Sequence, residues 1–330
     1  MVLPTIITQP GTSLRSLVGA FIITKLTEGK SDRTVESYSE NLKRFIWYAE
    51  SQNWPQNIHE ITQWHIKAFL GYVALEKDRW GLEGNGSETS QNRASQATVL
   101  HYYNILKLFY NWLMEEKILA ENFMDRIHVA KPPLTLIEPY SREDINRMLK
   151  ICDYDFEHYG GFLGSRNRAI ILVLLDTGLR LSEFLAMKLG DINPDNGQIK
   201  VVGKGRRKRV VRVGKTARSA VDQYLSYRPD NGRRELWLSE WSKPLSRDAL
   251  QCLVKRLKRR AGVDSRGSVH RFRHTFAVEF LRADHNVFNL QYLLGHSELE
   301  MVRRYTRALG MEDALAAHEQ ASPADMLGYT

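Results

Sequence analysis

The sequence predicts a mainly helical fold with one small β-sheet, an α+β fold, divided into two domains. Apolar residues recur at helical spacing from about residue 12 to residue 130. Two short β-branched runs, Gln198 to Val202 and Arg209 to Val213, flank a Gly-Lys-Gly turn, a pattern typical of a β-hairpin. A proline-bearing stretch breaks the helical periodicity between the two regions. The predicted parts are a helical domain over residues 1–131, a linker over 132–139, and a second domain over 140–330 that ends in a tail over 311–330.

Two long helices dominate the predicted N-terminal domain. Ser31 or Asp32 is expected to cap the first, because a periodic apolar stretch follows. The second is expected from Gln96 to Lys117, after a long exposed loop over Glu76 to Ser95. Its apolar side should hold Leu100, Tyr103, Leu106, Phe109, Tyr110 and Leu113. The core of the domain should also take up most of the tryptophans, Trp47, Trp54, Trp64, Trp80 and Trp112.

Composition limits the class of protein. The chain has 330 residues, a net charge of +9 and a pI near 9.4, which favours a polyanionic partner. No apolar run approaches the roughly 20 residues that span a bilayer, and the N-terminus lacks a signal-peptide pattern. We therefore expect a cytoplasmic, nucleoid-associated protein without a membrane partner. The two cysteines, Cys152 and Cys252, lack metal-ligand spacing and are expected to be reduced thiols.

The positive charge is concentrated in two runs. Lys204 to Arg212 holds six basic residues and no acid, and Lys255 to Arg260 holds five. An isolated run of this kind is usually a solvated surface, but two runs beside a candidate phosphate site favour nucleic-acid binding. The residues expected to contact DNA are Arg206, Arg207, Lys208, Arg209, Lys255 and Arg259.

A candidate anion site follows the apolar run Ile170 to Leu175, in the segment TGLRLSE. Gly178 can end one helix in a left-handed conformation, and Ser182 can cap the next. Arg180 would then lie beside exposed helix N-terminal amides, which attract anions. Glu183 either orients a neighbouring basic group or lies exposed in the first helical turn.

Five further residues stand in informative local settings. Lys204 occupies the hairpin turn, and His270 and Arg273 lie three residues apart, on one face of a helix. His296 ends the segment LLGH, and a capping box at Ser297 and Glu300 starts a helix that carries Tyr305. Each residue alone has an ordinary structural explanation, such as a core tyrosine or a surface arginine, but the ordered set does not.

The ordered set resembles the catalytic domain of tyrosine recombinases, the lambda-integrase and Xer-type DNA recombinases. The similar stretches are TGLRLSE, VVGKGRRKR, HRFRHTFA and LLGHSELEMVRRYTR, within about residues 140 to 310. The resemblance extends more loosely to the N-terminal part, which it identifies as a SAM-like core-binding domain that clamps DNA. It implies a catalytic set of Arg180, Lys204, His270, Arg273, His296 and Tyr305.

The resemblance also implies a mechanism. Two arginines hold a phosphodiester and stabilise the charge that develops on attack. Tyr305 is the nucleophile, with His270 or a water molecule as the base and His296 as a hydrogen-bond donor to the phosphate. Lys204 protonates the departing 5′ oxygen. No cofactor and no metal ion is required, and the phosphotyrosine linkage allows religation without ATP.

The expected partners are double-stranded DNA with a specific recombination site, other copies of the chain in a tetrameric synapse, and an accessory directionality factor. Integration or excision of a mobile element is the favoured programme, with Xer-type dimer resolution as an alternative. A type IB topoisomerase shares this chemistry, and a non-catalytic DNA-binding protein on the same fold is an alternative of a different class. Two rival motifs fail, because Gln198 replaces the first glycine of a P-loop and Arg271 replaces the glutamate of a His-Glu-x-x-His zinc site.

Overall fold

The chain forms two compact units, residues 1–134 and residues 135–330, in the computed structural model. The boundary falls inside the stretch expected to be a linker. The structure describes residues 11–75, 94–133, 138–203, 208–264, 267, 269–284 and 286–295, together with 305, 306, 310, 313, 315, 318 and 322.

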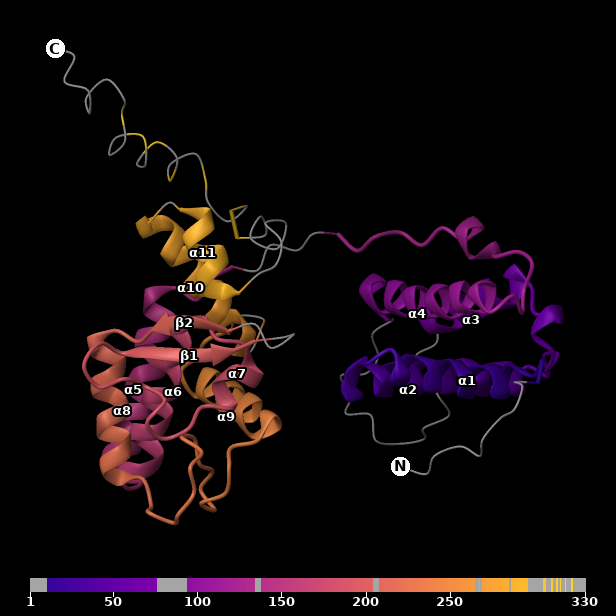
Figure 1. The fold of residues 1–330 in the computed structure, drawn as a ribbon. Coiled ribbons are helices and arrows are strands. Elements are labelled where there is room, and N and C mark those ends of the chain that lie inside the picture. The colour runs from indigo at the N-terminus through magenta and orange to yellow at the C-terminus, as the bar shows by residue number, and fades with distance from the viewer. Residues whose placement is uncertain are drawn as a thin grey trace. The chain divides into compact units, whose positions relative to one another are not determined.

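Helices build most of both units (Figure 1). Those of the first unit are α1 (Leu14–Thr27), α2 (Asp32–Ser51), α3 (Gln63–Leu75) and α4 (Gln96–Glu115), with 3₁₀ turns at Ile58–Glu60 and Phe123–Arg126. The second unit contains α5 (Arg142–His158), α6 (Gly161–Thr177), α7 (Leu181–Leu185), β1 (Gln198–Val202), β2 (Lys208–Arg212), α8 (Lys215–Tyr227), α9 (Arg247–Arg260), α10 (Val269–Asp284) and α11 (Val287–Leu294).

In the first unit, α1 pairs with α2 and α3 pairs with α4 around one apolar core (Figure 1). The expected cap of α2 is confirmed, because the Ser31 side chain accepts a hydrogen bond from the Thr34 amide. Ser95 caps α4 in the same way, through the Thr98 amide. The helix α4 ends two residues before the expected Lys117, and the expected loop over residues 76–93 lies outside the described residues.

The buried side of α4 differs from the expected one in its first half. Val99, Tyr102 and Ile105 are buried, whereas Leu100 and Tyr103 are only half-buried. The difference is a rotation of the buried stripe, because the first two turns contain apolar residues on more than one side. The second half matches, since the expected residues Leu106, Phe109, Tyr110 and Leu113 are all buried.

The tryptophans of the first unit divide between core and surface. Trp112 is buried and Trp54 packs against the core, as expected. Trp47 and Trp64 are 40% and 67% exposed, so the expectation that they fill the core is wrong. Trp64 carries the ammonium of Lys67 at 4.3 Å from its ring centroid, a cation–π contact on the surface. Trp80 lies outside the described residues.

The second unit packs α5, α6 and α8 beside the β-hairpin (Figure 1). Its core includes a stack in which the rings of Phe184 and Trp237 lie 4.7 Å apart and those of Trp237 and Tyr224 lie 5.6 Å apart. The helix α10 crosses α6 and is tied to the start of the unit, because the Tyr140 amide donates to the Thr275 hydroxyl at 2.8 Å. This framework fixes α7, α10 and β2 around one corner of the unit.

The predicted hairpin is confirmed, with its second strand one residue earlier than expected. Strands β1 and β2 are antiparallel, and Gln198 pairs with Arg212 while Val202 pairs with Lys208. Side chains alternate along β2, so Arg209 and Val211 face inward while Lys208 and Arg212 face solvent. The turn that carries Lys204 lies outside the described residues. Within the described part of the chain, no helix is long and apolar enough to cross a membrane.

Candidate active site

The corner between α6 and α7 follows from the backbone freedom of one glycine. Gly178 ends α6 in the left-handed conformation, at φ 55° and ψ 24°, as predicted. A Cβ atom there would lie 2.4 Å from a ring carbon of Phe276, so a side chain is excluded by strain and by space. The chain therefore turns sharply and places Arg180 at the start of α7.

The predicted cap at Ser182 is wrong, because α7 begins at Leu181 and its N-cap is Arg180. The carboxylate of Glu183 reaches back and accepts from the Arg180 amide at 2.8 Å. The carboxylate of the third helical residue thus satisfies the N-cap amide, which is one half of a capping box. The same carboxylate accepts from Nη1 of Arg180 at 3.0 Å, which fixes the guanidinium of this candidate catalytic residue.

Glu183 is buried and orients basic groups, so the first of its two interpretations is correct. Its side chain is 4% exposed and also accepts from Nη1 and Nη2 of Arg209, at 2.8 and 2.7 Å. Burial alone would raise the pKa of this carboxyl group, but the hydrogen bonds and charges of Arg209 and Arg180 lower it to about 2. Glu183 is therefore ionised at neutral pH.

The prediction that Arg209 contacts DNA does not fit the structure. Its side chain is 5% exposed, pairs with both oxygens of Glu183, and donates from Nε to the Leu293 carbonyl at 2.7 Å. Because all three of its guanidinium nitrogens donate to groups of the protein, this side chain faces the protein core. The inward alternation of β2 is the physical reason, since residue 209 lies on the same face as Val211.

The helix α10 supplies His270 and Arg273 three residues apart, as predicted. His270 is exposed in the first turn. Arg273 is 2% exposed and donates to the carbonyl oxygens of Gly178, at 2.7 Å, and Leu294, at 2.9 Å. Burial lowers the pKa of Arg273 to about 10, with a further lowering by Arg180 and opposing contributions from Tyr305 and Glu183. It remains a cation at neutral pH.

Tyr305 lies beside Arg273 and also belongs to a small apolar cluster. Its side chain lies beside that of Arg273, and its ring centroid lies 5.3 Å from that of His274. The residue is 7% exposed and packs with Ala277, Leu281, Leu290 and Leu294. The core interpretation and the active-site interpretation of Tyr305 are therefore compatible, since one face of the ring packs on the core while the side chain reaches the buried arginine.

The structure thus brings together Arg180, Arg273 and Tyr305 of the predicted set, with His270 on the same helix as Arg273. Lys204 and His296 lie outside the described residues, as do Arg206 and Arg207. No group of His, Cys, Asp and Glu residues suited to holding a metal ion occurs among the residues that the structure describes.

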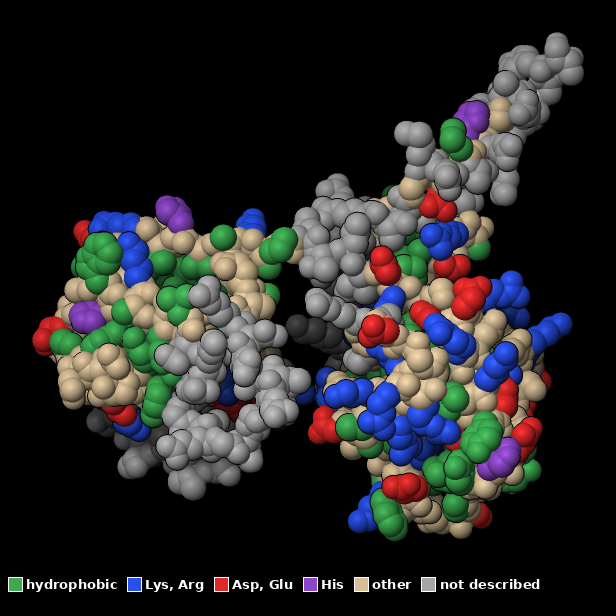
Figure 2. Space-filling model, turned by 180° about the vertical axis from the view of Figure 1, so that it is seen from behind, with side chains coloured by type: hydrophobic (Ala, Val, Ile, Leu, Met, Phe, Trp, Pro, Cys, Tyr) green, Lys and Arg blue, Asp and Glu red, His purple; other side chains and the backbone are tan. Residues whose placement is uncertain are grey.

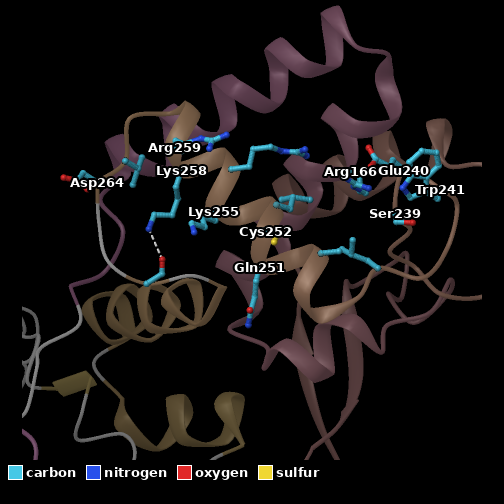
Figure 3. A pocket seen from close by; sticks show the side chains of 16 residues that line it. Arg166, Ser239, Glu240, Trp241, Gln251, Cys252, Lys255, Lys258, Arg259 and Asp264 are labelled. Atoms are coloured by element: carbon cyan, nitrogen blue, oxygen red, sulfur yellow. Dashed lines mark hydrogen bonds between the residues drawn. The ribbon is translucent and has the colours of Figure 1, made fainter. Parts of the chain in front are cut away.

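A basic cavity of about 1120 Å³ lies along α9 (Figure 3). Lys255 and Arg259, both predicted to contact DNA, are exposed and line it together with Arg256. Arg166 lines its other end, where it is buried and donates to the Leu238 carbonyl at 2.8 Å. Lysine and arginine side chains also gather over a broad part of the surface of this unit (Figure 2). Lys208 is exposed on β2.

This arrangement suits a phosphodiester. Guanidinium groups can donate two parallel hydrogen bonds to phosphate oxygens, and fixed donors act most strongly where little water is present. A tyrosine beside them supplies a nucleophile for phosphorus. The geometry of the site is therefore suited to phosphoryl transfer.

The chain belongs to the phage integrase family. Residues 140–311 match the Phage integrase family, and residues 17–119 match the Phage integrase N-terminal SAM-like domain. The protein is therefore a tyrosine recombinase, an enzyme that breaks and rejoins DNA strands.

Relatives with curated descriptions include tyrosine recombinase XerC of Leptospira interrogans, 28% identical over 303 residues that cover 91% of this chain and 90% of the relative. Tyrosine recombinase XerD of Halalkalibacterium halodurans is 27% identical and covers 86% of this chain and 89% of the relative.

Similar solved structures support the fold. The Tn1549 transposon integrase in complex with transposon right end DNA has a TM-score of 0.70 at 17% identity, covering 94% of this chain and 99% of that one. A lambda integrase dimer bound to a COC′ core site has a TM-score of 0.67 at 18% identity, covering 89% of this chain and 77% of that one.

Sequence reasoning missed two positions in the site. His274 is absent from the predicted site, although its position four residues after His270 places it on the same side of α10. Arg209 was assigned to DNA, although its spacing from Val211 in a β-branched strand indicates the inner face. Both positions could have been predicted from residue spacing, the four-residue spacing along a helix for His274 and the two-residue alternation along a strand for Arg209.

Replacing Glu183 by glutamine should destabilise the fold by about 3 kcal/mol, because it leaves the buried Arg209 without its opposite charge. The matched control is Glu279→Gln, which removes an exposed ion pair with Arg282 and should cost less than about 1 kcal/mol. Chemical denaturation measures both. An equal, small effect of the two substitutions would contradict the role of Glu183.

The loss should also depend on pH. The pKa of Glu183 is lowered to about 2 in the folded protein, against about 4.3 in an unfolded chain. Its stabilisation is therefore complete above about pH 5 and disappears as the pH falls towards 2. The difference between wild type and Glu183→Gln should shrink over that window and stay constant from pH 5 to 8.

Proposed function

We propose that this tyrosine recombinase is site-specific and acts through a covalent 3′-phosphotyrosyl intermediate formed by Tyr305. The observation that carries the proposal is the position of Tyr305, whose side chain lies beside the buried cation Arg273. A group that binds the phosphate is thereby next to the group that attacks it. Proximity of this kind converts attack into an intramolecular step.

The two arginines would stabilise the transition state more than the substrate. Arg180 is held by Glu183 and by the Gly295 carbonyl, at 3.0 and 3.1 Å, and Arg273 by two carbonyls. Such fixed donors do not reorganise when charge accumulates on the non-bridging oxygens. The oxygen of Tyr305 bonds to phosphorus as the bond to the 5′ oxygen breaks.

The remaining protons are assigned to the rest of the predicted set. A phenol is mostly protonated at neutral pH, so a base is needed, and His270 or a water molecule takes this proton. Lys204 delivers a proton to the 5′ oxygen, and His296 donates a hydrogen bond to the phosphate. The products are a 3′-phosphotyrosine and a free 5′ hydroxyl, and attack by the 5′ hydroxyl of a partner strand reverses the step.

The basic cavity along α9 supports a DNA-binding role for Lys255 and Arg259. Both are exposed, so a polyanion would pair with them without breaking an interaction inside the protein. Arg259 also lies in the last turn of α9, where a cation suits the helix dipole, so its position has a purely structural explanation as well. The salt dependence of binding distinguishes the two.

The programme we propose is integration or excision by a tetramer on DNA, with an accessory factor setting direction. Xer-type dimer resolution is the second candidate, and the relatives described as XerC and XerD favour it. The location of bound sites on the genome that encodes the chain separates the two. Sites at the ends of an inserted element support the first, and one site near the replication terminus supports the second.

Tyr305→Phe should abolish covalent capture while leaving DNA binding intact. Duplexes bound by the variant are first selected from genomic fragments, and a nick is then placed near the bound centre to trap cleavage. On a denaturing gel, wild type should retain the 5′-labelled strand and release a fragment whose 5′ end is a free hydroxyl. An adduct of equal yield with the variant would assign the attack to another residue.

Arg180→Lys should slow cleavage about a hundredfold at saturating protein, because a lysine cannot keep the contacts to Glu183 and Gly295 and also grip phosphate. Binding of the selected duplex should change by less than about threefold, since phosphate contacts elsewhere dominate affinity. Arg282→Lys is the matched control, an exposed arginine on α10 paired with Glu279, and should cleave at the wild-type rate. Equal rates for the two variants would exclude Arg180 from catalysis.

Replacing Lys255 and Arg259 together by methionine should lower the slope of log affinity against log salt by about 2, or about 1 for each phosphate that is no longer neutralised. Lys188→Met, an exposed lysine on another part of the same unit, is the control and should leave the slope unchanged. The measurement is a titration of labelled duplex at several salt concentrations. An unchanged slope for the double variant would assign these residues to the helix dipole and the solvated surface.

A further inference from the structure

Three consecutive backbone carbonyls at the end of α11 each accept a hydrogen bond from a different arginine. Leu293 accepts from Arg209 at 2.7 Å, Leu294 from Arg273 at 2.9 Å, and Gly295 from Arg180 at 3.1 Å. The C-terminal carbonyls of a helix lack partners within the helix and carry partial negative charge, so cations stabilise them. Two of these arginines belong to the predicted catalytic set, and Arg209 does not.

Arg209 donates a hydrogen bond from each of its three guanidinium nitrogens. Both of its terminal nitrogens donate to Glu183, while Nε donates to Leu293, so one planar group joins β2 to α7 and α11. A lysine in its place has one nitrogen and cannot make this set of three contacts. The three contacts fix the distance between the segment that carries Arg180 and the segment that carries Leu294.

The turn after α11 is shaped to receive this guanidinium. Gly295 adopts φ 63°, and a Cβ atom built on it would lie 3.0 Å from Cδ and 3.1 Å from Nη1 of Arg209. The absence of a side chain at residue 295 therefore lets Arg209 lie directly against the turn. Gly295 in turn accepts from Arg180, so the same residue contacts both arginines.

We propose that Arg209 is a positioning residue for strand cleavage, which sets the directions of Arg180 and Arg273 by locking Glu183 to the end of α11. It reaches Arg180 through the shared carboxylate of Glu183, and it reaches Arg273 through the adjacent carbonyls Leu293 and Leu294. The inference rests on the proposed function, because it concerns the rate of the same cleavage step.

A positioning role of this kind has a pH signature. The charged groups that face Glu183 are Arg180 at the start of α7, Arg209 on β2 and Arg273 on α10. Without Arg209, burial raises the pKa of Glu183 against the weaker opposition of the two remaining cations. A protonated Glu183 loses acceptor capacity towards the amide and Nη1 of Arg180, so cleavage should fall as the pH is lowered.

The test uses Arg209→Met and Arg209→Lys in the full chain, with Arg212→Met as the matched control. Arg212 lies on the same strand, is exposed, and donates only to the Asn196 carbonyl among the hydrogen bonds of its side chain that the structure describes. Single-turnover cleavage of the selected nicked duplex is measured from pH 5 to 8.5 with all protein-binding sites on DNA saturated. The double variant Glu183→Gln with Arg209→Met removes both buried charges together. It therefore leaves neither charge buried without its partner, which is the change that would destabilise the fold of a single variant.

Arg209→Met and Arg209→Lys should each cleave at least tenfold more slowly than wild type at pH 8, and Arg212→Met at the wild-type rate. The deficit of Arg209→Met relative to wild type should grow as the pH falls. In the Glu183→Gln background, removal of Arg209 should leave a deficit that does not vary with pH. Wild type in the same assay distinguishes failure of this inference from failure of the proposed function. If wild type forms no covalent adduct, the proposed function fails; if wild type forms the adduct, the assay tests Arg209 alone.

Two results would overturn the positioning role. Cleavage by Arg209→Met within threefold of wild type would show that the lock is dispensable. A deficit that is constant with pH for the single variant, or full recovery of cleavage in the double variant, would show that Arg209 serves only to neutralise a buried carboxylate.

Discussion

The active site of this recombinase depends on one buried carboxylate. Glu183 is 4% exposed, and a carboxylate there is tolerated only because cations and amides surround it. Its partners come from the start of α7 and from β2, and through Arg209 it reaches the end of α11. Segments that are far apart in the sequence are thereby joined by hydrogen bonds with defined geometry, in place of apolar packing alone.

The charge balance of this centre explains why it suits an anion. Arg180, Arg209 and Arg273 supply three positive charges, and Glu183 supplies one negative charge, so the described part of the site has an excess of two positive charges. The pKa of Arg273 is lowered to about 10 by burial, a sign that its charge is held at a cost. Backbone carbonyls compensate only part of that cost, and a bound phosphate would compensate more.

Local signals allowed much of the fold to be predicted. Gly178 was predicted as a left-handed helix end because few other residues adopt that conformation, and the cap of α2 was predicted to be Ser31 or Asp32 because a capping side chain acts on its own helix. The hairpin was predicted from turn chemistry and β-branched residues. These features depend on residues close in sequence, so a short window contains their cause.

The features that could not be predicted depend on distant partners. Ser182 has the side chain of a good cap, but the backbone turn at Gly178 places the helix start two residues earlier, with Arg180 as the N-cap, where Glu183 accepts from the Arg180 amide. The role of Arg209 depends on a carboxylate 26 residues away and on a carbonyl 84 residues away. A basic run in the sequence gives no indication of which of its members turns inward, unless the alternation of the strand is applied to it.

The position of Tyr305 joins the packing of the fold to its chemistry. A nucleophile on a freely moving chain would lose orientation each time the site emptied. Here Tyr305 belongs to one apolar cluster with Leu290 and Leu294, and its side chain lies beside that of Arg273, which donates to the Leu294 carbonyl. A phosphate that pairs with Arg273 would therefore lie next to the tyrosine, in keeping with the role proposed for Tyr305.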